Sequence, residues 1–255
     1  MANQDSLLLD GTLNGHAVVK DVMSNPVFTA DLVIAGFSYR ADTVGDIAVK
    51  VNNEKANAFS ADIALTGNKN DVKIQGEYYT GEGRMDLKVL LNQLNLASLN
   101  GPAAGQVQGM RGFLKGQLAL SGTLDKPLLR GNLNFDSARL TPVISGEPLV
   151  LSNDRIEFDE DGFNFSKFRM SDSAGNKLTI DGNVFTKDYR KYGFDMSLNA
   201  ANFRLVNAPE SGNQEFYGKL NIDAAINLQG DMVSPKVDGD LRVNRQTDFF
   251  CVAGE

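Results

Sequence analysis

The sequence contains no tryptophan, one cysteine and one histidine among its 255 residues. The single cysteine, Cys251, cannot form a disulfide within the chain. Together with His16 it cannot supply the three or four Cys and His ligands of a typical zinc site. These shortages predict a chain with no metal site and no cofactor, and the lack of tryptophan disfavours a sugar-binding platform.

Long hydrophobic runs and basic runs are also absent. The densest apolar run, Leu32 to Phe37, has six residues, against roughly 20 for a membrane-spanning helix, so no transmembrane segment is expected. The first residues lack a basic region, and Leu7 to Leu9 is too short for the core of a signal peptide. We therefore expect an internal fragment of a longer protein. The net charge of −7 disfavours a nucleic-acid partner, because phosphate binding needs clustered Lys and Arg.

Apolar residues alternate with polar ones throughout the chain, and no helical periodicity extends beyond two turns. The longest alternation places apolar residues at every second position from Leu220 to Leu228. Turn residues such as Asp159 to Gly162 separate the alternating segments at intervals of roughly 8 to 12 residues. This pattern predicts an all-β fold of about sixteen to eighteen short, mostly antiparallel strands with few or no helices. The segment from Ala97 to Gly112 has no such pattern and is predicted to be a loop, with room for one helical turn.

One hairpin pattern occurs three times, in residues 15–34, 116–135 and 224–243. In the second copy, strands containing Leu118, Leu120 and Leu133, Phe135 flank a connection marked by Gly122 and Pro127, and Gly131 opens the second strand. A shift of 108 residues superimposes this copy on the third, and a shift of 101 relates it to a more degenerate first copy. The repetition predicts a single elongated domain over residues 1–255 that extends by adding similar hairpins.

An array of amphipathic strands must cover its apolar face, because large exposed apolar patches are rare on monomeric proteins. The pattern offers no helix for this purpose, so the face must meet another sheet, curl over on itself or hold an apolar ligand. On composition alone, the packed core of a β-sandwich or solenoid is the simpler interpretation.

Four segments carry a resemblance to a known family. They are Gly116 to Phe135 with its Gly-Thr-Leu-Asp-Lys-Pro connection, Ile156 to Asp159 followed by Gly162 and Phe163, Asp172 to Gly182, and the later Gly-to-Pro repeat. Their order and spacing resemble the C-terminal β-rich part of the TamB family (translocation and assembly module inner-membrane subunit), within the AsmA-like superfamily. The resemblance extends over nearly the whole chain.

The resemblance implies a long, curled sheet, a β-taco, that forms a trough with an apolar interior in the periplasm of a Gram-negative envelope. Its expected partners are phospholipids and, through the full-length protein, an Omp85-type barrel in the outer membrane. The expected role is non-enzymatic: conduction of acyl chains between the membranes and support of outer-membrane biogenesis. The membrane anchor of the family is not in this sequence, so anchoring in the inner membrane and transport are expected of the full-length parent chain.

Acyl chains need an apolar lining without directional contacts, and alternation kept in phase over many strands supplies one. The residues expected to line the groove share one parity within each strand. They are Leu87, Val89, Leu118, Leu120, Leu133, Phe135, Ile156, Phe158, Phe163, Phe165, Leu178, Ile180, Phe194, Met196, Leu198, Ile222, Ile226, Leu228 and Leu241. The opposite parity is mostly Asn, Asp, Lys, Ser and Gln. Glycines within the strands, such as Gly76 and Gly182, are expected either to let the sheet coil or to mark bulges.

Other motifs in the sequence give only weak evidence for catalysis or ligand binding. His16 is the only histidine that could serve a Ser-His-Asp triad, and it lacks a nucleophile elbow nearby, so an exposed histidine at a strand end is the preferred interpretation. Asp159 to Asp161 lack the spacing of a calcium loop and predict a solvated turn. Gly101 to Gly116 contain no nucleotide-binding fingerprint. Two alternatives stay open: a structural or adhesive β-protein that binds partners at its sheet edges, and, more weakly, an all-β hydrolase with carboxylates on distant strands.

Overall fold

The structure is a computed structural model that describes residues 8–21, 23, 26–151, 154–210 and 216–251. The described residues form sixteen strands and one short 3-10 helix. The first eight strands and the helix are β1 (Leu9–Lys20), β2 (Val27–Tyr39), β3 (Asp42–Asn52), β4 (Ala58–Gly67), β5 (Asn70–Tyr79), β6 (Arg84–Asn95), η1 (Leu96–Leu99), β7 (Val107–Thr123) and β8 (Pro127–Pro142). The remaining strands are β9 (Leu149–Leu151), β10 (Arg155–Phe158), β11 (Gly162–Ser171), β12 (Lys177–Phe185), β13 (Gly193–Ala208), β14 (Phe216–Asp231), β15 (Pro235–Val243) and β16 (Asp248–Cys251).

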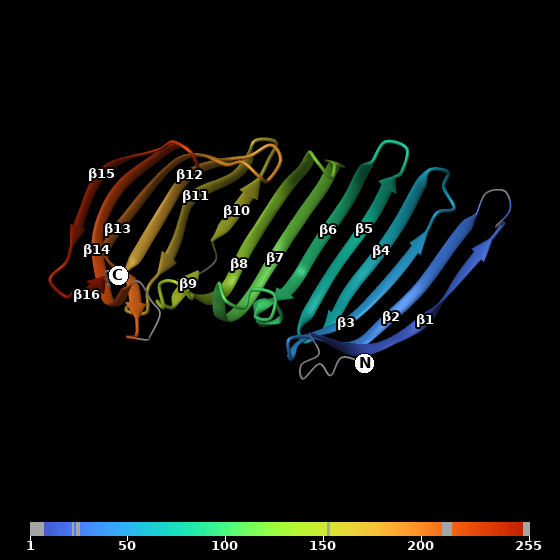
Figure 1. Ribbon diagram of the computed structural model, residues 1–255, viewed down its shortest axis with the longest axis horizontal. Helices are drawn as coiled ribbons and strands as arrows, with labels where there is room; N and C mark the ends of the chain where they lie inside the picture. Colours follow the sequence, from blue (N-terminus) through green and yellow to red (C-terminus); the bar gives the residue numbers. More distant parts are fainter. Residues whose placement is uncertain (1–7, 22, 24–25, 152–153, 211–215, 252–255) are drawn as a thin grey trace, which may run out of the picture. The chain divides into compact units, whose positions relative to one another are not determined.

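Hydrogen bonding joins these strands into one antiparallel sheet, in which nearly every strand pairs with its neighbours in sequence (Figure 1). Only two short strands depart from this order. Strand β9 pairs with β8 and β11, and β16 pairs with β14 beyond the end of β15. The prediction of an all-β, antiparallel architecture is confirmed.

Short turns account for this simple order. Strands β2 and β3 are joined by Arg40 and Ala41, and β4 and β5 by Asn68 and Lys69, all four with positive φ between 44° and 66°. Two successive left-handed residues form the tight hairpin turn that matches the twist of the flanking strands. Asn68 is a usual residue for such a turn. Alanine is not a usual residue for such a turn, so Ala41 gave no indication in the sequence that a turn lies there.

The contacts within the chain form two compact units. The first unit comprises Met1–Pro102 and Phe113–Leu133, and the second comprises Ala103–Gly112 and Asn134–Glu255. The first therefore holds β1 to β6 and most of β7, and the second holds the end of β8 and all later strands. Strands β7 and β8 contribute residues to both units.

The hairpins β7–β8 and β14–β15 share their local geometry. A Cβ added at Gly131 would collide with the carbonyl oxygen of Gln117, and one at Gly239 would collide with that of Ala225. These two pairs are related by the same shift of 108 residues. The predicted start of the second strand at Gly131 was wrong: β8 begins at Pro127. A proline is tolerated at the first residue of a strand, so the strand begins there and Gly131 lies inside it.

Two further expectations are corrected. The predicted loop Ala97 to Gly112 does contain the helical turn η1, but strand β7 already begins at Val107. Gly109 and Gly112 have positive φ within that strand and break its alternation, which hid it. Gly76 is not a bulge, since it pairs in register with Ala61 and Leu87. It has φ +155°, and a Cβ there would collide with the carbonyl oxygen of Asp86, so only glycine fits.

Few side chains are fully buried. Among the described residues, the buried apolar side chains of the first unit include Val72, Met85 and Leu91, and those of the second include Phe168 and Phe203. Most other apolar residues of the strands are only partly buried. A sheet of this length with so small a closed core leaves much of its apolar surface within reach of solvent or of a ligand.

Candidate functional site: an apolar sheet face

In the first unit, the cross-strand register aligns aliphatic side chains into a row across six consecutive strands. Each member lies directly opposite the next, and antiparallel neighbours in register point to the same face of the sheet. The row consists of Leu32 (β2), Val49 (β3), Ile63 (β4), Ile74 (β5), Val89 (β6) and Leu118 (β7). Strand alternation in a single chain therefore becomes a continuous apolar stripe that runs across the strands.

Two more rows flank this stripe on the same face. The first consists of Ile34, Ile47, Leu65, Val72 and Leu91, and the second of Ala30, Val51, Ala61, Gly76, Leu87 and Leu120. Residues two apart along a strand are separated by roughly 6.6 Å, and neighbouring strands by about 4.8 Å. The three rows thus define an apolar surface about 13 Å wide and about 24 Å long over β2 to β7.

The predicted lining residues of this unit lie on that surface. Leu87 lies across from Leu120, and Val89 across from Leu118. All four side chains are partly buried, as is Leu133 on β8. The structure also adds β2 to β5 to the face, which the predicted set omitted because it began at Leu87. The alternation of Val49, Ile63 and Ile74 in the sequence was sufficient to include them.

The second unit has rows of the same kind. One row consists of Ile156, Phe165, Gly182, Met196, Leu228 and Val237, and another of Phe168, Ile180, Leu198 and Ile226. Phe158, Phe163, Val184 and Phe194 form a third, and Met170, Leu178, Ala200, Ala224 and Leu241 a fourth. Every predicted lining residue from Ile156 to Leu241 belongs to these rows except Ile222, which lies opposite Phe203.

The predicted lining residues of the second unit range from fully buried to largely exposed. Ile222 is 8% exposed and belongs to the closed core, whereas Leu241 is 59% exposed on β15, where the sheet ends. Phe135, at the end of the predicted hairpin, packs edge-on against the buried Phe168, with ring centroids 5.6 Å apart. The other predicted side chains of this unit are partly buried. The sequence pattern identified the face, but it did not distinguish its closed parts from its open parts.

The opposite face of the first unit is polar. Lys50 forms an ion pair with Asp31, with 3.6 Å between the Nζ and Oδ2 atoms, and Gln75 donates a hydrogen bond of 2.8 Å to Asp62. A shallow depression of about 670 Å³ on this face is lined by Lys73, Gln75, Lys88, Leu90, Gln117 and Arg130, among others. The two faces of one set of strands therefore differ sharply in chemistry, as the alternation predicts.

The second unit buries the carboxylate of Asp172 among hydrogen-bond donors. Asp172 is 2% exposed, and burial alone would raise the pKa of its carboxyl group. Hydrogen bonds from the Asn176 side chain and from the backbone N–H groups of Arg204, Asn176 and Ala174 outweigh that effect, so the pKa lies below its usual value. The Asp172 carboxylate therefore fixes the β11–β12 turn against β13.

The remaining sequence signals are placed as follows. Asp159 accepts hydrogen bonds from the N–H groups of Asp161 and Gly162, which confirms a turn at this point. His16 lies within β1 rather than at its end, exposed and opposite Asp31. In the described ranges, no group of three or more His, Cys, Asp or Glu residues could hold a metal ion.

Comparison with known families finds a match in the C-terminal part of the chain. Residues 166–254 match the family described as the TamB C-terminal domain. The chain carries a TamB-like C-terminal region. The TamB match begins in β11 and continues through β16, so it lies within the second unit. No curated protein and no solved structure matches the chain.

The TamB match indicates an envelope protein that takes part in outer-membrane biogenesis, in a family of transport and assembly components. It also indicates partnership with the outer-membrane assembly machinery. Within the part of the chain that the structure describes, no helix is both long and apolar enough to cross a membrane.

Proposed function

We propose that this chain is a non-enzymatic, periplasmic segment of a TamB-like envelope protein whose apolar sheet face binds phospholipid acyl chains. In this proposal the parent chain is anchored in the inner membrane and conducts lipids between the inner and outer membranes, and an Omp85-type barrel in the outer membrane is its partner. The apolar rows within each unit support the proposal, and the TamB match supports the envelope setting.

The observation that carries the proposal is the combination of alignment and incomplete burial. Three apolar rows run in register across β2 to β6, and two of them continue to β7, yet side chains such as Ile63, Ile74 and Val89 keep part of their surface exposed. Removing apolar surface from water lowers the free energy of a complex by about 25 cal/mol per Å² of buried area. An acyl chain laid across the rows would cover this area and would need no directional contact.

The acyl-chain proposal can be tested by native mass spectrometry of the purified chain, followed by organic extraction. We expect bound phospholipid, and we expect delipidated protein to take up lipid again from vesicles. A monomeric chain that carries no lipid and takes up none would contradict the proposal.

The sheet edges favour a second candidate function. Every residue of β1 and every residue of β15 is exposed, so each presents a row of backbone groups at an edge. Such edges can pair with a strand of another protein. A structural or adhesive role through these edges would appear as oligomers, or as complexes that form without lipid. Charged residues on β15, such as Lys236 and Asp238, disfavour non-specific pairing of this edge with strands of other proteins.

A further inference from the structure

A depression of about 580 Å³ lies on the second unit, at the short strand β9, which pairs with β8 on one side and with β11 on the other. All of its lining residues belong to this unit. They include two arginines and three residues with hydroxyl groups: Arg111, Arg139, Thr141, Ser171 and Ser173. Neither the apolar rows nor the sheet edges account for this group of side chains.

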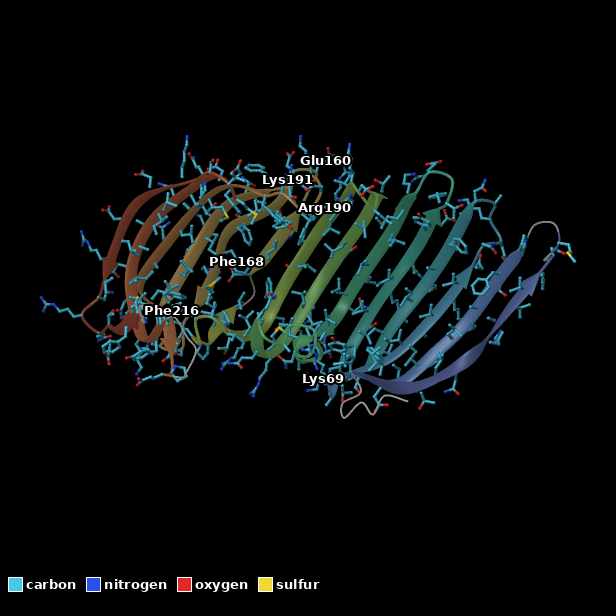
Figure 2. The ribbon with its side chains drawn as sticks, viewed as in Figure 1. Lys69, Glu160, Phe168, Arg190, Lys191 and Phe216 are labelled. Carbon is cyan, nitrogen blue, oxygen red and sulfur yellow. The ribbon has the colours of Figure 1, made fainter. Side chains whose placement is uncertain are left out.

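The depression lies on the face opposite to the apolar rows. One cross-strand row in this region continues the apolar face and consists of Ala138, Leu151 and Met170. The adjacent row lines the depression and consists of Arg139, Val150 and Ser171. Because successive side chains of a strand alternate between faces, Ser171 points away from the face of Phe168, which Figure 2 labels on the same strand. A ligand in the depression is therefore separate from any acyl chain on the apolar face.

The two arginines are neighbours across β7 and β8. A Cβ added at Gly112 would lie 2.7 Å from the Cα of Ala138, so these two residues face each other. In antiparallel strands the next facing pair is then Arg111 and Arg139, and both side chains are exposed. Among the residues that the structure describes, neither guanidinium group has a hydrogen-bond or ion-pair partner. Like charges that face each other across strands repel, so an anion bound between them would relieve the repulsion.

The carboxylates beside the depression are turned away from a ligand. Asp172 belongs to the lining, but it is 2% exposed, and both of its carboxylate oxygens already accept hydrogen bonds. Glu147 is fully buried and accepts the backbone N–H of Ser173 at 2.6 Å. A ligand in the depression therefore meets guanidinium and hydroxyl groups rather than carboxylate oxygens.

We propose that this depression binds a phosphate monoester whose carbon skeleton carries hydroxyl groups. The planar guanidinium groups of Arg111 and Arg139 each donate paired hydrogen bonds to the phosphate oxygens. The hydroxyl groups of Thr141, Ser171 and Ser173 exchange hydrogen bonds with those of the ligand, since a hydroxyl both donates and accepts. The volume leaves room for the carbon skeleton beside the phosphate. Such an ester occurs free in solution or as a headgroup at a bilayer surface, and both present the same group to the arginines.

Four small probes test the chemistry of the site by titration calorimetry of the full chain: glycerol 3-phosphate, inorganic phosphate, glycerate and glycerol. Glycerol 3-phosphate should bind about tenfold more tightly than glycerate, because a phosphate has enough oxygens for paired bonds to two guanidinium groups and a carboxylate does not. Inorganic phosphate should bind with intermediate affinity, since it lacks the hydroxyl groups. Glycerol, which has no charge, should give no measurable binding. Affinity for the phosphates should fall as the salt concentration rises.

Variants at the arginines give the matched test. Arg111→Gln with Arg139→Gln should lose about tenfold or more in affinity for glycerol 3-phosphate. Both side chains are exposed, so the double variant should fold, and without ligand it should unfold at no lower temperature than the parent. Arg139→Lys keeps the charge but not the planar fork, and it should lose part of the affinity. Arg242→Gln with Arg245→Gln makes the same change in net charge at exposed positions outside the depression, and it should bind like the parent chain.

Cosedimentation with phosphatidylcholine vesicles, with and without phosphatidic acid, separates the two sources of the phosphate. Binding of glycerol 3-phosphate without any preference for phosphatidic acid vesicles would support the site and assign it to a free ester. A preference for phosphatidic acid vesicles that the Arg111 and Arg139 double variant loses would support the site and assign it to a bilayer headgroup. Glycerate bound as tightly as glycerol 3-phosphate, a double variant that binds like the parent, or no binding of any phosphate probe would overturn the proposal. These results leave the acyl-chain proposal unchanged, because it concerns the other face.

Discussion

Val89 on β6 lies directly opposite Leu118 on β7, while the preceding residue, Lys88, lies opposite Ala119 on the other face. A slip of one residue would exchange these faces, because successive side chains of a strand alternate between them. The same in-register relation holds from β2 to β7. The apolar stripe therefore depends on accurate registration over many strands, and the short turns between β2 and β6 help to maintain it.

Leu120→Asp should separate binding from folding. The side chain is partly buried on the apolar face, so a carboxylate there can remain hydrated and should cost only about 1–2 kcal/mol in the free energy of unfolding. Bound lipid should nevertheless be lost in native mass spectrometry. Ala119→Asp, on the opposite face, is the control and should retain lipid. Retention of lipid by the Leu120 variant would argue against this part of the face.

Phe168→Ala should destabilise the chain far more than a change on the open face. Phe168 is 3% exposed and packs against the rings of Phe135 and Phe165, both at 5.6 Å. Removing such a side chain leaves a cavity and costs about 3–5 kcal/mol. Urea unfolding monitored by circular dichroism measures the loss. A cost below about 1 kcal/mol would show that this core is not closed.

Gly131→Ala and Gly239→Ala should have similar, large effects, because both glycines approach a carbonyl oxygen at the same position of the repeated hairpin. Their φ angles are +131° and +141°, which L-residues rarely adopt. Each change should lower stability by about 1–3 kcal/mol. Gly81→Ala is the control, since no atom lies within 4 Å of a Cβ there. Equal thermal stability of all three variants would contradict the shared geometry.

Asp172→Asn should alter the dependence of stability on pH. The pKa of Asp172 is lower in the folded chain than in the unfolded chain, so ionisation stabilises the fold above about pH 3.9. This contribution disappears as the pH falls through the folded-state pKa. The variant should therefore be less stable than the parent at pH 7, and the difference should shrink toward pH 3. A difference that stays constant would exclude a role for the carboxylate charge.

The sequence was enough to predict the all-β class, the antiparallel order and the parity that forms the apolar face, since alternation is a local property. It misplaced the starts of β7 and β8, where glycines and a proline interrupt the alternation. It did not reveal that Ile222 would be buried and Leu241 exposed, because burial depends on which strand lies beyond each residue. Nor did it reveal the tyrosines of residues 186–192 as part of that face. Their contact with Phe163 joins segments that no local pattern relates.

The most direct test of the central claim is site-specific photocrosslinking at neighbouring residues of one strand. A photoreactive amino acid at Ile63 points to the apolar face, and one at Asp62 points to the polar face of the same strand. After incubation with phospholipid vesicles, the apolar-face acyl-chain account predicts lipid adducts at position 63 and none at position 62. Equal labelling at both positions, or none at 63, would contradict it.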